Sequence, residues 1–501
     1  MRSMNRVCAA FILILLLWGC GAQEGQSKRP VQDSLTLGKA EIDSPIEPVF
    51  KEVTEPQVEF DLPQIRERNR LVALTGYSSN SYFIYKGETL GFEYELLKML
   101  ANDLGLELEI VIVRNLDQIF SMLNEGKGDL VAYSMTVTKQ RLQKVDFSRH
   151  HTLIHQVLVQ KMPDNWRDMK RHEIDNMLVT NPVDLIGRKV HVRKRSSYYA
   201  RLLNLSDEIG GDIDIVEVPG HVSTEELIAM VSRGEIDYTV ADENYAMVSA
   251  AYLTNIDIRT PISFPQRIAW AVRRNSPELK TAISQWIQEI KRGPIYNVLF
   301  QKYYENKRFF KQRVKSDYFS ITGGNISPYD DLIKKHAKRL NWDWRLLASQ
   351  VYQESQFDPK AESWAGARGL MQLMPRTAKQ FGAKKITNPT QNISAGVKYL
   401  KWLATYWADI PDSLERVKFM LGAYNAGQGH VEDARRLAKK YDKDPNIWDG
   451  HVAEWLLKKA QEEHFNDEVV EHGYCRGQEP VEYVNEIFKR YTEYQQLVAS
   501  R

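Results

Sequence analysis

Residues 343–355 of this 501-residue chain have the sequence DWRLLASQVYQES, and this stretch decides the fold of the C-terminal part. Trp344, Leu347 and Val351 are spaced three and four apart, which predicts one apolar face of an amphipathic helix. A further step of three places Glu354 at the edge of that face. Desolvation raises the pKa of a carboxyl in such a place, because burial disfavours its charged form. The stretch therefore predicts a helix over 343–355 that holds a proton-donating acid.

Three further motifs follow this helix. Residues 363–375 are SWAGARGLMQLMP, with glycines for a tight loop before an apolar helix start. Residues 422–427 are GAYNAG, and Gly427 is the expected cap of a helix whose predicted apolar stripe contains Leu414, Val417, Leu421 and Tyr424. Residues 479–484 are EPVEYV and open the last helix. The helical periodicity of residues 326–501 predicts an all-α domain.

In this order, the four motifs resemble the catalytic domain of the soluble-lytic-transglycosylase type, which is related in fold to goose-type lysozyme. The resemblance implies a lysozyme-like domain that acts on peptidoglycan glycan strands, with Glu354 as the catalytic acid. Pro480 departs from the family pattern, which more often has Thr before the helix that carries the tyrosine. The resemblance also implies a set of substrate-binding or positioning residues, namely Ser355, Ser363, Met371, Gln372, Tyr424, Asn425 and Tyr483.

The number of candidate carboxyls bears on the mechanism. Ordinary glycosidases use a pair, whereas only Glu354 lies on an apolar stripe here, and Asp358 and Glu362 are expected to be solvated loop residues. One acid suits an intramolecular reaction that closes the MurNAc C6 hydroxyl on C1 and forms a 1,6-anhydro sugar. Two alternatives stay open, a hydrolytic muramidase and a murein-binding or sensor protein with an inactive lysozyme-like domain.

Upstream, strands and helices alternate from Leu71 to about residue 305, which predicts a parallel α/β sheet. The order of several short motifs resembles the type 2 periplasmic solute-binding domains that recognise amino acids; these are GFEYEL at 91–96, GDL at 128–130, TKQR at 138–141, VDFS at 145–148 and GEID at 234–237. The resemblance implies a two-lobed α/β domain. Arg141 stands where the family has its carboxylate-binding arginine, and Asp242 where it has its ammonium-binding aspartate. Three alternatives stay open for this domain: it binds an amino acid, it binds a murein peptide, or it binds no ligand. If it binds one, the ligand is expected to act as an effector that regulates the enzyme.

The N-terminus predicts export and a lipid anchor. Arg2 and Arg6 precede a short apolar run at 9–19, typical of a signal peptide. Leu17-Trp18-Gly19-Cys20 resembles the lipobox of bacterial lipoproteins, although Trp18 replaces a small residue. The resemblance implies cleavage before Cys20, acylation of that residue, and a place on the periplasmic face of the outer membrane. The alternatives are an uncleaved anchor and an ordinary secretory signal.

The sequence thus predicts a multidomain chain: a signal peptide (1–19), a disordered tether (20–66), a solute-binding-like domain (67–305), a linker (306–325) and a lytic transglycosylase domain (326–501). Sixty-seven basic and 65 acidic residues are too balanced for a dedicated nucleic-acid binder. We expect no cofactor, because no phosphate loop or dinucleotide fingerprint occurs. We also expect no metal site, since His151 and His155 flank a strand-like segment without the glutamate of a zinc motif.

Overall fold

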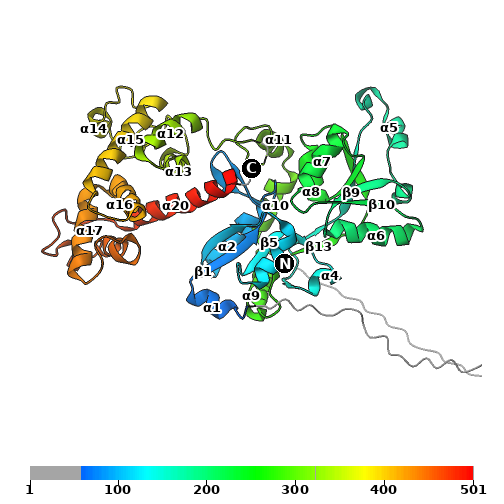
Figure 1. Cartoon of the computed structure of the whole chain (residues 1–501), viewed down its shortest axis with the longest axis horizontal. Coiled ribbons are helices and arrows are strands. Elements are labelled where there is room, and N and C mark those ends of the chain that lie inside the picture. The colour runs from blue at the N-terminus through cyan, green and yellow to red at the C-terminus, as the bar shows by residue number, and fades with distance from the viewer. Residues whose placement is uncertain (1–57, 322, 500–501) are drawn as a thin grey trace, which may run out of the picture. The chain divides into compact units, whose positions relative to one another are not determined.

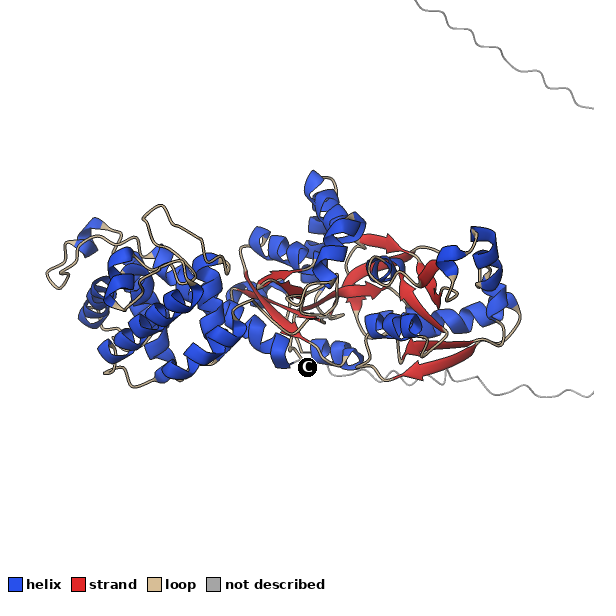
Figure 2. Cartoon of the chain, turned by 90° about the horizontal axis from the view of Figure 1, so that it is seen from above, coloured by secondary structure: helices blue, strands red, loops and turns tan. Residues whose placement is uncertain are grey.

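The computed structural model describes residues 58–321 and 323–499 (Figure 1). The predictions for residues 1–57, including the signal peptide, Cys20 and most of the tether, lie outside the described residues. The predicted fold class is confirmed: a two-lobed α/β domain precedes a helical domain. Every strand of the described residues lies before residue 273, and Figure 2 shows the strands gathered apart from the helical domain.

The first lobe is built on a mixed sheet of order β4-β1-β5-β13-β6, with β7 also paired to β13. Strands β1, β4 and β5 are parallel, as the alternation of strands and helices predicts, and β13 runs antiparallel to β5. The strands are β1 (Arg70–Thr75), β4 (Glu107–Ile112), β5 (Leu130–Thr136), β6 (Asp146–Phe147), β7 (Thr152–Ile154) and β13 (Gln266–Val272). The helices of this lobe are α2 (Phe92–Asp103), α3 (Ile119–Asn124), α4 (Lys139–Leu142), α9 (Pro277–Ile290) and α10 (Pro294–Phe300).

The second lobe has a sheet of order β10-β9-β11-β8-β12. The chain enters it between β7 and β8 and leaves it between β12 and β13, so two crossing segments join the lobes. Its strands are β8 (Gln156–Lys161), β9 (Lys189–Arg193), β10 (Asp214–Val218), β11 (Tyr238–Asp242) and β12 (Ile256–Pro261). Its helices are α5 (Arg171–Met177), α6 (Ser197–Ile209), α7 (Thr224–Arg233) and α8 (Glu243–Ala250).

Two segments are more structured than the sequence predicts. Residues 62–67, at the end of the predicted tether, form helix α1 (Leu62–Glu67), which buries Leu62 and Ile65 in the core of the first lobe. Within the predicted linker, helix α11 (Lys307–Val314) buries Arg313 completely. The Arg313 guanidinium lies over four phenylalanine rings, and its Nη2 donates to the Ser79 carbonyl at 2.9 Å.

The C-terminal domain is helical, with one continuous core. Helix α13 packs against the C-terminal helix α20, and α16 packs against α15, α17 and α20. Gly427 caps α16 with a φ of 90°, as predicted, but Leu414 of the predicted stripe is 53% exposed. The helices are α12 (Asp330–Ala337), α13 (Trp344–Ser355), α14 (Pro375–Gln380), α15 (Pro389–Tyr406), α16 (Ser413–Ala426), α17 (Gln428–Lys440), α18 (Ala453–Lys458), α19 (Glu462–Phe465) and α20 (Gln478–Ala499).

A hairpin of the first lobe, β2 (Phe83–Tyr85) and β3 (Glu88–Leu90), contacts the far end of α20. Tyr494 donates a hydrogen bond from its hydroxyl to the Gly87 carbonyl at 2.8 Å, and Thr89 donates one to Glu493. Within residues 58–321 and 323–499, no helix combines the length and the apolar character needed to cross a membrane.

Candidate active site

Helix α13 carries the predicted acid, as the spacing of its apolar residues predicts. The helix begins after Asp343, whose side chain accepts a hydrogen bond from the Arg345 amide at 3.0 Å. Leu347 and Val351 are fully buried on its inner face. Glu354 lies one turn further, half-buried at the end of this face. The helix therefore presents a carboxyl that is neither in the core nor free in solvent.

Burial raises the pKa of Glu354 to about 8, well above the ordinary value for a glutamate. The Tyr483 hydroxyl donates a hydrogen bond to Glu354 Oε1, and this bond lowers the same pKa without cancelling the effect of burial. Tyr483 is itself held by Gln350, whose Nε2 donates to the tyrosine oxygen at 3.2 Å. At neutral pH the carboxyl keeps its proton, as a general acid must.

Tyr424 of α16 is the third polar group of the cluster. Its hydroxyl donates to the Met371 carbonyl at 2.8 Å. Burial raises the pKa of Tyr424, and the charge of Glu354 raises it further. Three helices thus converge at one point, with Glu354 from α13, Tyr424 from α16 and Tyr483 from α20.

The loop between α13 and α14 is fixed by a buried asparagine of α15. Asn392 accepts a hydrogen bond from the Met371 amide at 2.7 Å and donates one to the Arg368 carbonyl at 3.0 Å. Gly369 has a φ of 82°, and a Cβ there would lie 2.4 Å from the Asn392 side chain. This position therefore requires glycine, both for its backbone conformation and for the close approach of the asparagine.

Three other predicted site residues differ in burial: two are buried and one is exposed. Ser355 is buried and donates to the Leu370 carbonyl at 2.9 Å, and the side chain of Met371 is buried against Gly396. Both side chains are buried in the core rather than exposed to solvent. Asn425, next to Tyr424, is exposed.

Ser363 and Gln372 stabilise the loop itself. The Ser363 hydroxyl accepts from the Ala367 amide at 3.0 Å. Gln372 adopts a positive φ of 44° and donates to the Ala361 and Gly369 carbonyls at 3.0 and 2.9 Å. In the structure their polar atoms are thus engaged by the loop.

The two loop carboxyls are exposed, as predicted. Glu362 forms an ion pair with Arg368 at 2.6 Å, and Asp358 accepts from the Lys360 amide at 2.8 Å. Each is engaged within its own loop rather than with Glu354. Glu354 therefore stands as a single acid beside two tyrosines.

Two residues of the site, Gln350 and Asn392, were not predicted from the sequence. Gln350 lies four residues before Glu354 and so shares its helix face, a signal that could have found it. Asn392 lies 21 residues from the amide that it binds, and no local pattern connects the two.

The two predicted effector residues lie in the solute-binding domain. Arg141 lies within α4 and donates from Nη1 to the Thr136 carbonyl at 2.7 Å. Burial, and after it the charge of Arg193, lowers its pKa to about 10. Asp242 ends β11, and its burial raises its pKa to about 6, while the charge of Arg141 opposes that shift. The structure thus brings the two predicted residues within electrostatic reach of each other.

A cavity of about 440 Å³ lies in the same domain, and its lining includes Tyr133, Arg193 and Glu225 but neither Arg141 nor Asp242. Glu225, from α7 of the second lobe, accepts a hydrogen bond from the Ser79 amide of the first lobe at 3.2 Å. The two lobes are therefore in direct contact beside this cavity.

Comparisons with known proteins agree with this two-domain architecture. The family of bacterial extracellular solute-binding proteins, family 3, matches residues 71–306, and the transglycosylase SLT domain matches residues 331–447. A membrane-bound lytic murein transglycosylase F from Desulfosudis oleivorans is 37% identical over 428 residues, which cover 85% of this chain and 90% of that protein. This chain belongs to the membrane-bound lytic murein transglycosylase F family.

Other relatives carry the same name. A Stutzerimonas stutzeri protein is 32% identical, with 86% of each chain covered, and one from Pseudomonas fluorescens is 30% identical, with 86% of this chain and 85% of that protein covered. The chain is accordingly an enzyme, a lytic transglycosylase that acts on peptidoglycan, and the alternative of an inactive sensor is set aside.

Among solved structures, an ancestral amino acid-binding protein is 23% identical with a TM-score of 0.40, covering 48% of this chain and 98% of that one. Holo ArgBP from T. maritima is 24% identical with a TM-score of 0.39, covering 48% of this chain and 98% of that one.

In this transglycosylase F chain, the helix that contacts Glu354 through Tyr483 lies outside the matched catalytic domain. The SLT match ends at residue 447, whereas α20, which supplies Tyr483, spans residues 478–499. The hydrogen-bond partner of Glu354 thus comes from a helix beyond the matched domain, and the same helix reaches the solute-binding domain.

Proposed function

We propose that this lytic murein transglycosylase cleaves the β-1,4 bond between MurNAc and GlcNAc without water and leaves a 1,6-anhydro-MurNAc end. The observation that supports this is the half-buried acid beside Tyr424 and Tyr483, Glu354, whose pKa of about 8 keeps it protonated at neutral pH. Both carboxyls of the neighbouring loop are exposed and engaged elsewhere. A reaction that takes its nucleophile from the substrate needs no second carboxylate.

In the proposed reaction, Glu354 gives its proton to the glycosidic oxygen as the bond from C1 to that oxygen breaks. The resulting carboxylate then takes the proton of the MurNAc C6 hydroxyl while O6 bonds to C1. The acid ends the cycle protonated, and no water is consumed. Because the nucleophile is already part of the substrate, proximity contributes several kcal/mol, out of the roughly 7–11 kcal/mol that the best intramolecular cases reach.

The remaining predicted residues have supporting roles in this proposal. Tyr483 orients the Glu354 carboxyl and stabilises its charged form. Tyr424 and Asn425 contact the glycan near the cleaved bond. Ser355 and Met371 shape the floor, and Ser363 and Gln372 hold the loop in the form that receives the N-acetyl group.

Product analysis tests the proposal directly. Purified peptidoglycan is digested with the wild-type protein, and mass spectrometry determines whether the released ends are anhydro or reducing. We expect anhydro ends, and for Glu354→Gln a rate lower by at least about 100-fold, because the general acid is lost. Glu362→Gln, which changes an exposed carboxyl of the adjacent loop, is the matched control and should keep its rate. Reducing ends would instead establish the hydrolytic muramidase.

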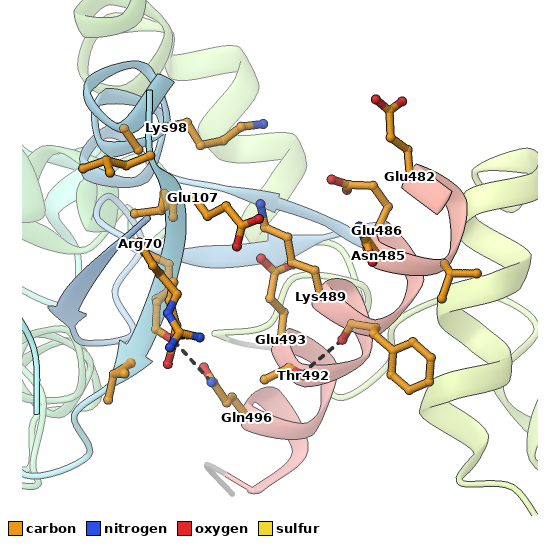
Figure 3. Close-up of a pocket in the computed structure, with 18 of the residues that line it drawn as sticks. Arg70, Lys98, Glu107, Glu482, Asn485, Glu486, Lys489, Thr492, Glu493 and Gln496 are labelled. Carbon is orange, nitrogen blue, oxygen red and sulfur yellow. Dashed lines mark hydrogen bonds and ion pairs between the residues drawn. The ribbon is translucent and has the colours of Figure 1, made fainter. Parts of the chain in front are cut away.

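We further infer that an effector bound by the solute-binding domain regulates the enzyme. Helix α20 supports this inference, because it holds Tyr483 near its start and contacts the β2–β3 hairpin near its end. An open cavity of about 1070 Å³ lies along the same helix, between α20 and β4. Figure 3 shows Glu486, Lys489 and Glu493 of α20 facing this cavity opposite Arg70 and Glu107.

The effector in this proposal is an amino acid or a murein peptide, and Arg141 and Asp242 would bind it. Calorimetric titration of the full chain with free amino acids and with cell-wall stem peptides tests the proposal, together with turnover measurements at saturating ligand. We expect one class to bind and to change turnover, and Asp242→Asn to weaken that binding. If neither class binds or alters turnover, the regulatory proposal is wrong, whatever the product analysis shows.

For membrane attachment we propose a lipid anchor at Cys20 on the periplasmic face of the outer membrane. The lipobox-like sequence Leu17-Trp18-Gly19-Cys20 supports it, as do the relatives named membrane-bound. Labelled fatty acid should appear on the wild-type protein and not on Cys20→Ser, which should leave the outer-membrane fraction. Retention of the variant in that fraction would contradict the proposal.

A further inference from the structure

Helix α15 carries a row of aromatic side chains on its outer face, formed by Tyr399, Trp402 and Tyr406. We call these three residues the aromatic row. They are spaced three and four apart, so they follow one another along one side of the helix. The Tyr399 and Trp402 rings are stacked with centroids 6.0 Å apart, and the Trp402 and Tyr406 centroids are 5.7 Å apart.

The aromatic row is continuous with the cluster of Glu354, Tyr424 and Tyr483. The Tyr399 ring lies 5.1 Å from the ring of Tyr424, whose pKa is raised in part by the charge of Glu354. Helices α15 and α16, which carry the two tyrosines, pack against each other. A path of ring contacts therefore begins at Tyr424, beside Glu354, and leads outward along α15.

Exposure increases along this path. Tyr424 and Tyr399 are half-buried, whereas Trp402 is 40% and Tyr406 43% exposed. The opposite side of the helix already supplies the core with Leu400, Leu403 and Trp407, all fully buried. The outer rings are thus not needed to bury the helix, and large exposed aromatic side chains in a contiguous row mark a binding surface.

The chemistry of the row fits a sugar chain. A pyranose ring presents an apolar face of C–H groups, which packs on the face of an aromatic ring, while its hydroxyls remain at the edge in contact with water. Consecutive rings can receive consecutive sugars of an extended strand. Tryptophan and tyrosine provide large contact areas of this kind.

We propose that Trp402 and Tyr406 form an outer glycan-binding subsite, which holds the peptidoglycan strand away from the bond that Glu354 cleaves. This proposal depends on peptidoglycan being the substrate, but it does not depend on whether the released ends are anhydro or reducing. It acts on binding rather than on chemistry, because its rings lie beyond Tyr424 and Tyr399 from the acid. The enzyme would consequently favour long strands over short fragments.

Binding is measured first, with a full-length chain that cannot cleave its ligand. Glu354→Gln is combined with Trp402→Ala or with Tyr406→Ala, and co-sedimentation with insoluble peptidoglycan sacculi gives the affinity. We expect each double variant to bind roughly tenfold more weakly than Glu354→Gln alone, equivalent to about 1.4 kcal/mol. Trp402→Phe should restore most of the affinity, since it keeps an aromatic face. Tyr474→Ala, which removes another exposed tyrosine of the same domain, is the control and should bind normally.

Kinetics with the active enzyme supplies the second measurement. For long glycan strands, we expect Trp402→Ala to raise KM several-fold with little change in kcat. For a tetrasaccharide with one cleavable bond, both parameters should stay at the wild-type values, which also shows that the variant is folded.

Two results would overturn the proposal. One is unchanged sacculus affinity in both double variants. The other is an equal loss of turnover on the strand and on the tetrasaccharide. Binding to phosphatidylethanolamine–phosphatidylglycerol vesicles is measured in parallel; if the substitutions weaken vesicle binding but not sacculus binding, the row contacts lipid and the glycan subsite is wrong.

Discussion

At the scale of single residues, the proposed mechanism depends on the balance of two effects on one carboxyl. Burial raises the pKa of Glu354, and the Tyr483 hydrogen bond lowers it. The first effect keeps the proton available for donation at neutral pH, and the second stabilises the carboxylate that accepts a proton in the second step of the proposed mechanism. A glutamate in water would be charged before the reaction began, and one buried without the tyrosine would form the carboxylate less readily.

Replacing Tyr483 by phenylalanine separates these two effects. The substitution removes the donor to Glu354, so the carboxylate is less stable and the pKa of Glu354 rises further. We expect the alkaline limb of the pH–kcat profile, which reflects loss of the acid's proton, to move to higher pH. We also expect kcat to fall by roughly tenfold or more, because a hydrogen bond to a charged group contributes about 1.5–3 kcal/mol.

Tyr491→Phe is the matched control for this variant. Tyr491 lies on the same helix, and its hydroxyl bonds to Asp343 at 3.3 Å rather than to the acid. Its pH profile should coincide with that of the wild type. An unshifted profile for Tyr483→Phe would show that the tyrosine does not act on the acid.

At the scale of elements, the sequence predicted well what depends on local periodicity. The helix expected over 343–355 is α13, and the last helix begins one residue before the expected motif. Glu354 could be identified because it ends an apolar stripe whose inner residues are indeed buried. Gly427 could be identified as a helix cap because its positive φ suits glycine.

The predictions that were incomplete concern contacts between distant segments. Helix α1 lies in a stretch whose composition suggests disorder, but two apolar side chains dock on the first lobe and stabilise it. Arg313 looks like a solvated linker charge in the sequence, yet its guanidinium lies over three rings of residues 309–319 and over Phe83 of the distant β2–β3 hairpin. Leu414 fits the helical period but lies at the exposed start of α16.

The same distinction holds within the site. Glu354 and Tyr483 lie 129 residues apart, and only the family resemblance paired them before the structure did. The aromatic row has a clear helical spacing, but its connection to the acid depends on the packing of α15 on α16. Spacing along one helix is visible in a sequence, whereas the neighbour across a helix interface is not.

At the scale of the whole described chain, one helix joins the enzyme to the solute-binding domain. Glu493 of α20 is buried, which raises its pKa, and Thr89 of the β2–β3 hairpin donates a hydrogen bond to it. Tyr494 bonds to the Gly87 carbonyl, and Gly87 has a φ of 83° with three aromatic side chains close around it. A shift of this hairpin would therefore move helix α20, which carries Tyr483.

Thr89→Val tests this route, because it removes the donor to Glu493 while keeping the shape of the side chain. If α20 transmits the proposed regulation, the variant should bind the effector with wild-type affinity when no peptidoglycan is present. Its basal turnover should stay within about twofold of the wild-type value. Its response to the effector should be lost or strongly reduced, because the coupling free energy between two sites is typically only about 1–3 kcal/mol. Turnover with and without saturating effector gives the answer. Thr492→Ala, on the same helix but bonded only to the Phe488 carbonyl, is the control and should respond normally. A full response in Thr89→Val would mean that this hydrogen bond does not carry the coupling, and that α20 only joins the two domains.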